Sequence, residues 1–200
     1  MDLLNLLRSA AAERGLINSD QDMDAALVFS LVRDMPYKRA SDRKPETIIA
    51  EWRGTCSGKH YLLHMLFEEL GLTSRIIACT SITPIDPGEI RAELQKLYDA
   101  ANRRFVDVHN YLLVTTPDGE EMVVDATWPL SAEKHGMVVN KAFIIGQDQE
   151  IATKPVQTWV VPPDSDAQTF KDQLLSEHFT SAELQFREVV IEALSESTQE

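Results

Sequence analysis

A pair of extended runs joined by a very short turn constrains the fold of this chain more than any other feature. Residues 105–116 and 120–128 are rich in β-branched and aromatic residues, and only Pro117-Asp118-Gly119 separates them. This pattern is typical of an antiparallel β-hairpin. With a type I turn at the first two loop positions and a left-handed glycine at the third, Thr116 pairs with Glu120.

The register of this hairpin predicts which polar side chains meet. Continuing the pairing from the turn sets Tyr111 opposite Asp125 and His109 opposite Thr127. His109 and Asp125 then become diagonal neighbours on one face, about 7–8 Å apart at the backbone. A loop one residue shorter or longer would put them on opposite faces. Asp107 shares the face of His109 and is a second candidate to orient the imidazole.

An apolar helical run beginning at Cys56 is the second strong feature. The run covers residues 56–70, and Gly71 stands where a left-handed residue would end the helix. A cysteine in the first turn lies among unpaired backbone N–H groups at the positive end of the helix dipole, which favours thiolate over thiol. Lys59, one turn on, adds a cation on nearly the same side.

A nucleophilic cysteine needs a base within hydrogen-bond reach, and the base needs a group that orients it. His109 and Asp125 supply these two groups if the hairpin register is correct. The sequence therefore predicts a catalytic triad of Cys56, His109 and Asp125. In the expected reaction, the Cys56 thiolate attacks an amide or ester carbonyl and His109 protonates the leaving group.

Three segments of the chain, in order, carry a family resemblance: PETIIAEWRGTCSGKHYLLHMLFEELGLTSRIIACT, VDVHNYLLV and EEMVVDATWP. Over roughly residues 45–130 the sequence resembles the transglutaminase-like superfamily of papain-like cysteine enzymes. The resemblance implies the same Cys56, His109 and Asp125 triad on an α+β papain-like fold. Members include peptidases, amidases, acyltransferases, protein cross-linkers and inactive relatives, so the reaction subtype does not transfer.

The chain departs from the family pattern in three places. Ser57-Gly58-Lys59 follows the cysteine where an aromatic residue is common, and His109-Asn110-Tyr111 replaces a common His-Ala-Trp. Residues 80–104 exceed the minimal core, and we expect them to form a lid or a substrate-binding insertion. These departures bear on the substrate class more than on the triad.

The expected fold is α+β, papain/transglutaminase-like, with the cysteine helix packed on an antiparallel sheet. We expect one domain over residues 1–200, with a core at about 45–162 and helical extensions at 1–44 and 163–200. The predicted helices are 2–14, 22–33, 45–52, 56–70, 89–103 and one or two within 166–194, and the predicted strands are 74–80, 105–116, 120–128, 136–145 and 155–161.

Groups that stabilise the oxyanion are also predicted. The backbone N–H of Cys56 is one expected donor, worth roughly 3 kcal/mol in such sites. The indole N–H of Trp52 and the hydroxyl of Thr55 are candidates for the second donor. Lys59 is a candidate either to contact a substrate carboxylate or to tune the cysteine.

Two other functions compete with catalysis. Cys56, His60, His64 and Glu68 recur every four residues and could line one stripe of a helix, a spacing that can hold zinc or copper. Alternatively, the chain is a binding or assembly protein that keeps the fold without turnover. The sequence predicts no cofactor for the enzymatic reading.

Composition limits the partners and the compartment. A formal net charge of -13 argues against nucleic acid and anionic membranes as partners, and no apolar run reaches the roughly 18 residues of a membrane span. Two cysteines, Cys56 and Cys79, are too few for a disulfide framework, which favours a reducing, cytoplasmic setting. We expect Cys79 to be a packing residue and residues 2–14 an amphipathic helix rather than a signal peptide.

Overall fold

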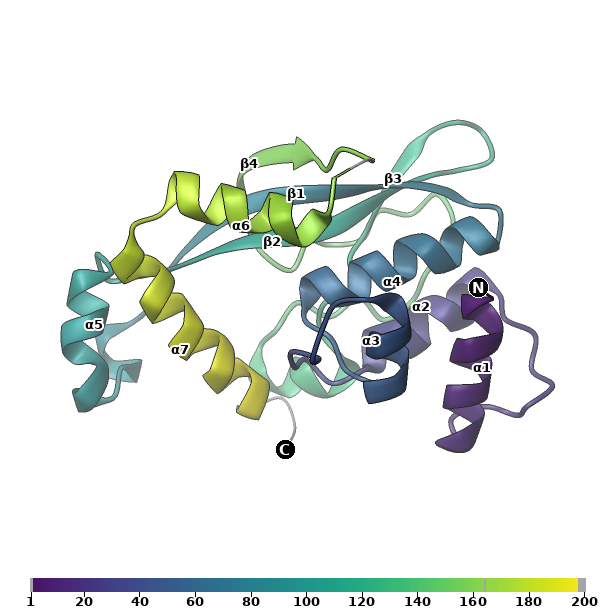
Figure 1. Ribbon diagram of the computed structural model, residues 1–200, viewed down its shortest axis with the longest axis horizontal. Coiled ribbons are helices and arrows are strands. Elements are labelled where there is room, and N and C mark those ends of the chain that lie inside the picture. The colour runs from purple at the N-terminus through teal and green to yellow at the C-terminus, as the bar shows by residue number, and fades with distance from the viewer. Residues whose placement is uncertain (1, 164, 198–200) are drawn as a thin grey trace.

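The computed structural model describes residues 2–163 and 165–197, which form an α+β arrangement around one antiparallel sheet (Figure 1). In chain order the elements are α1 (Leu3–Glu13), α2 (Ala25–Asp34), α3 (Pro45–Glu51), α4 (Cys56–Glu69), β1 (Thr73–Pro84), the 3-10 helices η1 (Pro87–Glu89) and η2 (Ala92–Leu94), α5 (Gln95–Ala100), β2 (Arg104–Thr115), β3 (Glu121–Val124), the 3-10 helix η3 (Leu130–His135), β4 (Pro155–Val160), α6 (Ala167–His178) and α7 (Ser181–Ser197).

The sheet has the strand order β3-β2-β1-β4, and its hairpin has the predicted register. The Thr116 N–H donates to the carbonyl of Glu120 at 2.8 Å, and Gly119 has the left-handed φ of 88° that the turn requires. Leu112 pairs with Val124 at the last position of β3. Asp125 therefore lies one residue beyond the strand, directly after the last recorded pair.

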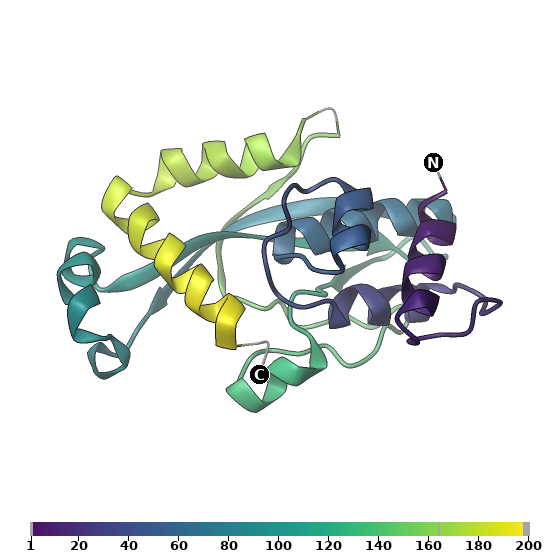
Figure 2. The same ribbon diagram turned by 60° about the horizontal axis from the view of Figure 1, so that its bottom comes forward.

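Helix α4 packs across β1 and β2 and carries the centre of the core. Most of its apolar side chains are buried, although Met65 is exposed, and Gly71 ends the helix with a φ of 79°. Figures 1 and 2 show α1, α2 and α3 gathered around α4 near one end of the sheet, while α5 and α7 lie toward the other end. The fully buried apolar residues of α4 are Leu62, Leu63, Leu66 and Phe67.

A close approach between α3 and α4 positions the start of α4. A Cβ atom added at Gly58 would meet Ile48 Cδ1 at 2.7 Å, which is closer than two carbon atoms pack. Glycine at this position therefore lets α3 lie directly against the first turn of α4. The close contact between Gly58 and Ile48 therefore fixes the position of the first turn of α4 relative to α3.

Three sequence predictions need correction. Residues 136–145 contain no strand, because side chains take up their backbone carbonyl groups: Arg33 Nη1 donates to the carbonyls of Asn140 at 3.2 Å and Lys141 at 2.6 Å, and Gln149 Nε2 donates to that of Ala142 at 2.9 Å. The predicted helix at 89–103 is divided into short turns and α5. Strand β3 ends at Val124 rather than at Trp128.

The C-terminal residues form two helices, both of which contact β2. Within the part of the chain that the structure describes, no helix combines the length and apolar character needed to cross a membrane.

Candidate active site

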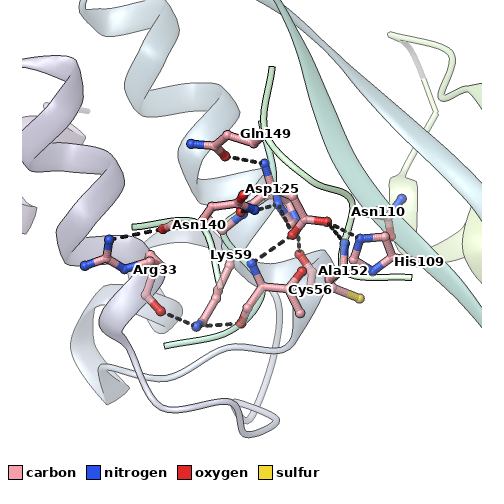
Figure 3. Close-up of polar contacts among 12 residues, drawn as sticks. Arg33, Cys56, Lys59, His109, Asn110, Asp125, Asn140, Gln149 and Ala152 are labelled. Carbon is pink, nitrogen blue, oxygen red and sulfur yellow. Dashed lines mark hydrogen bonds and ion pairs between the residues drawn. The ribbon is translucent and has the colours of Figure 1, made fainter. Parts of the chain in front are cut away.

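Cys56, His109 and Asp125 come from three separate elements and meet at one buried place. Cys56 is the first residue of α4, His109 lies in the middle of β2, and Asp125 follows β3. His109 Nε2 lies 2.7 Å from Asp125 Oδ2. A side-chain hydrogen bond also joins His109 to Cys56, and Figure 3 shows the sulfur beside the imidazole ring. Since Nε2 faces the carboxylate, Nδ1 is the ring nitrogen left for the sulfur.

Asp125 is held in place from several directions. Its Oδ2 also accepts the Ala152 N–H at 2.8 Å, and its Oδ1 accepts the Thr127 N–H at 3.0 Å. Burial alone would raise the pKa of this carboxyl group, but the charge of His109 and the hydrogen bonds from His109 and the Ala152 N–H lower it far below its ordinary value. The carboxylate is therefore a permanent anion next to the imidazole.

The pKa values of His109 and Cys56 move in opposite directions. Burial disfavours the imidazolium, yet the negative charges of Asp125 and Cys56 outweigh it and raise the pKa of His109 to about 10. Burial likewise opposes the thiolate, but the charge of Lys171 and the hydrogen bond from His109 lower the pKa of Cys56 to about 6. At neutral pH the resting pair is thiolate and imidazolium.

Lys171 of α6 is a member of this cluster that the sequence reasoning missed. Its Nζ lies 3.7 Å from Cys56 Sγ and 3.2 Å from Ser57 Oγ, and the side chain is buried. A signal was present in the sequence, because Lys171 falls three and four positions before Leu174 and Leu175 on the apolar face of its helix.

Asp107 shares the buried surroundings of His109 but has a different partner from the one considered above. Its Oδ1 accepts from Arg187 Nε at 2.7 Å and Nη2 at 2.6 Å, and lies 3.6 Å from Lys171 Nζ. Asp107 thus joins the C-terminal helices to the sheet, while Asp125 alone of these two carboxylates hydrogen-bonds His109 in the described structure. The prediction that Asp107 could orient the imidazole is therefore wrong.

Lys59 does not lie at the sulfur, which corrects its predicted role. Its ammonium is fully buried and donates to the carbonyl oxygens of Arg33 at 2.7 Å and Thr127 at 3.0 Å (Figure 3). Burial lowers its pKa to about 7. Lys59 therefore joins α4 to the last turn of α2 and to the segment after β3, and has no place as a substrate contact in this arrangement.

The two candidates for the second oxyanion donor lie in different settings. Trp52 ends α3 with a left-handed φ of 51°, and the Arg14 guanidinium of α1 stacks over its ring at 4.8 Å. This stacking directs Trp52 toward α1. Thr55 is the half-buried N-cap residue of α4, next to Cys56, and its side chain makes no capping hydrogen bond. Thr55 stays a predicted donor on this geometry.

His60 has a structural role that spacing alone did not indicate. Its Nδ1 donates to the Cys56 carbonyl at 2.8 Å, and its Nε2 accepts the Ala126 N–H at 2.9 Å. Burial lowers its pKa to about 4, so the ring is neutral as this bonding requires. His60 thereby ties the first turn of α4 to the segment that carries Asp125.

The proposed metal stripe does not assemble. His64 Nδ1 bonds Ser74 Oγ at 2.7 Å, and both nitrogens of His60 are occupied. Among the residues that the structure describes, no group of three or more His, Cys, Asp and Glu side chains could hold a metal ion.

Cys79 lies opposite His109 in the sheet but packs with apolar neighbours, including Ile77 and Tyr111. Burial raises the pKa of its thiol to about 12. The two cysteines are therefore chemically distinct, and both are free.

The site is closed in this structure. Cys56 is 2% exposed, His109 is 5% exposed and Lys171 is 4% exposed. A reagent or substrate reaches the sulfur only if neighbouring groups move.

Comparison with protein-family models, with curated protein sequences and with solved structures found no match for this chain. What the site can do follows from its geometry and charges.

Proposed function

We propose that the protein is a cysteine-dependent acyl-transfer enzyme that uses Cys56, His109 and Asp125 on a papain/transglutaminase-like fold. The observation that carries the proposal is the contact of one imidazole with both a thiol at a helix N-terminus and a buried carboxylate. That arrangement supplies nucleophile, acid–base group and orienting group within hydrogen-bond reach.

In the first half of the reaction, the Cys56 thiolate attacks the carbonyl carbon of an amide or ester. The carbonyl electron pair moves onto oxygen, and the Cys56 N–H in the first turn of α4 is available to stabilise that charge. When the tetrahedral intermediate collapses, the bond to the amine or alcohol breaks. His109 gives its Nδ1 proton to that leaving group, and a thioester remains on Cys56.

In the second half, water or an amine attacks the thioester while neutral His109 accepts its proton. Collapse releases the acid or the new amide and restores thiolate and imidazolium. Asp125 stabilises the imidazolium whenever His109 holds the proton, because its charge lies 2.7 Å from Nε2. The partner is therefore a molecule that contains an amide or ester group. The two free cysteines support a reducing compartment such as the cytoplasm.

The test is capture of the thioester. Purified protein would be incubated with a panel of activated acyl esters, and intact-mass spectrometry would follow acyl addition. We expect addition at Cys56, sensitive to hydroxylamine and absent in Cys56→Ala. Cys79→Ala is the matched control and should acylate normally. Acylation that persists in Cys56→Ala, or no acylation of the folded protein by any ester, would contradict the proposal.

A second candidate function, a binding or assembly protein without turnover, is favoured by the closed state of the site, in which Cys56 is 2% exposed. The two functions differ in thiol chemistry. A thiol pKa near 8.5 in the folded protein would favour the binding protein, whereas a pKa near 6 accompanied by acylation favours the enzyme.

A further inference from the structure

The C-terminal helix α6 brings a cation to the sulfur from 115 positions away in the sequence. Lys171 Nζ lies 3.7 Å from Cys56 Sγ, a donor–sulfur separation suited to a charge-assisted hydrogen bond. It also donates to Ser57 Oγ at 3.2 Å, and Ser57 donates to Asn110 Oδ1 at 2.9 Å. The ammonium is thus directed at the first turn of α4 by more than one contact.

The local charges show why the sulfur needs this cation. The imidazolium of His109 lies against Asp125, so its positive charge is already shared with a carboxylate. A buried thiolate without a further partner would carry a large desolvation cost. Lys171 supplies that partner, and Asp107, 3.6 Å from Nζ, supplies a carboxylate behind it.

We propose that Lys171 is a fourth residue of the active centre, whose ammonium group pairs with the Cys56 thiolate and keeps it charged and oriented. The proposal rests on the proposed function only in taking Cys56 as the nucleophile. It assigns a catalytic role to a residue of a helix that lies outside the region of family resemblance.

Other groups also act on the sulfur and must be controlled for. The charged and titratable side chains that face it or feel its charge are His109 and Asp107 of β2, Arg187 of α7, Cys79 of β1, Tyr37 and Arg43 of the segment between α2 and α3, and Lys59 and Tyr61 of α4.

The alternative is that Lys171 has a purely structural role. It would then only hold α6 to β2 through Asp107, as Arg187 holds α7 through the same carboxylate. Arg187 is similarly buried, at 6% exposed against 4% for Lys171, and its hydrogen bonds go to carboxylates rather than to the sulfur. Arg187→Met is therefore the matched variant that removes an anchoring cation and leaves the sulfur contact.

The experiment measures the rate of Cys56 alkylation by iodoacetamide from pH 4.5 to 10 in a Cys79→Ala background. The variants are Lys171→Met, Lys171→Gln, Lys171→Arg and Arg187→Met, with Lys154→Gln as a control for net charge at an exposed position. Circular dichroism and thermal unfolding verify the fold of each variant. The midpoint of each profile reports the thiol pKa, and its plateau reports access to the sulfur.

We expect Lys171→Met and Lys171→Gln to raise the midpoint by about 1 to 3 units, the usual effect of removing an opposite charge at this range. Lys171→Arg should restore most of the shift, and Arg187→Met should move the midpoint less while raising the plateau. If Lys171→Met does not fold, the Gln and Arg variants decide. A midpoint unchanged by removal of the Lys171 charge, or moved equally by Arg187→Met, would overturn the proposal.

The outcome is separable from that of the proposed function, because alkylation requires no turnover. A shifted midpoint with no ester acylation would leave Lys171 as the thiolate partner and reject the enzyme. Acylation with an unshifted midpoint would keep the enzyme and reject the role of Lys171.

Discussion

His109 hydrogen-bonds Asp125 through Nε2 at 2.7 Å, which leaves Nδ1 as the nitrogen that can hydrogen-bond Cys56. The imidazole therefore spans a carboxylate and a sulfur with its two ring nitrogens. Asp125 is itself held by the Thr127 and Ala152 N–H groups, so the orientation of the ring derives from backbone contacts.

Asp125→Asn should weaken the thiolate–imidazolium pair. Without the carboxylate charge, the pKa of His109 should fall from about 10 toward its ordinary range, and the pKa of Cys56 should rise above 6. We expect acylation to slow by roughly 10² to 10⁴-fold, as for comparable changes in other triads. NMR titration of His109 measures the first effect. Asp118→Asn, at an exposed turn, is the control, and an unchanged His109 titration in Asp125→Asn would contradict the prediction.

Labelling of Cys56 should depend on the size of the reagent. Because the residue is 2% exposed, reaction requires local opening, and a larger reagent requires a larger opening. We expect iodoacetamide to react faster than a maleimide attached to a long polyethylene glycol chain, although maleimides ordinarily react faster with free thiols. Peptide mapping should find Cys79 unlabelled until the protein is unfolded. Preference for the bulky maleimide in the folded protein would indicate an open site.

His60 should make the folded state sensitive to mild acid. Its pKa is about 4 when folded and about 6.5 when unfolded, so the unfolded chain binds the extra proton between these values. This contribution to stability is present above pH 6.5 and is lost as the pH falls through 4, to a total of about 3 kcal/mol. Urea unfolding at pH 7 and pH 4.5 should show a smaller acid loss for His60→Gln than for the natural protein. The exposed variant His135→Gln is the control, and equal losses for all three proteins would refute the assignment.

Gly58→Ala should destabilise the protein although alanine favours helix. The new methyl group would meet Ile48 Cδ1 at 2.7 Å, and overpacking of this kind costs about 1 to 3 kcal/mol. Ile48→Val removes that carbon atom and by itself costs about 0.5 to 1.5 kcal/mol. In the double variant we expect a loss smaller than the sum of the two single losses, measured by urea unfolding. Additive losses would show that the two residues are not coupled.

Short-range features were predictable from the sequence. The Pro117-Asp118-Gly119 loop sets the hairpin register, and this register predicted that Asp125 lies within reach of His109. The absence of a strand at 136–145 was not predictable, because the β-like composition of this segment did not reveal that the Arg33 side chain, about a hundred positions earlier, takes up the carbonyls of Asn140 and Lys141.

The sequence by itself therefore determined the hairpin register and the helix that begins at Cys56, since turn geometry and helical periodicity act over a few residues. Only the tertiary structure decided which cation serves the sulfur. Lys59, three residues away, extends to two carbonyl oxygens, while Lys171 arrives from α6. A buried lysine adopts the conformation in which its ammonium group has partners, and the available partners come from segments far apart in the chain.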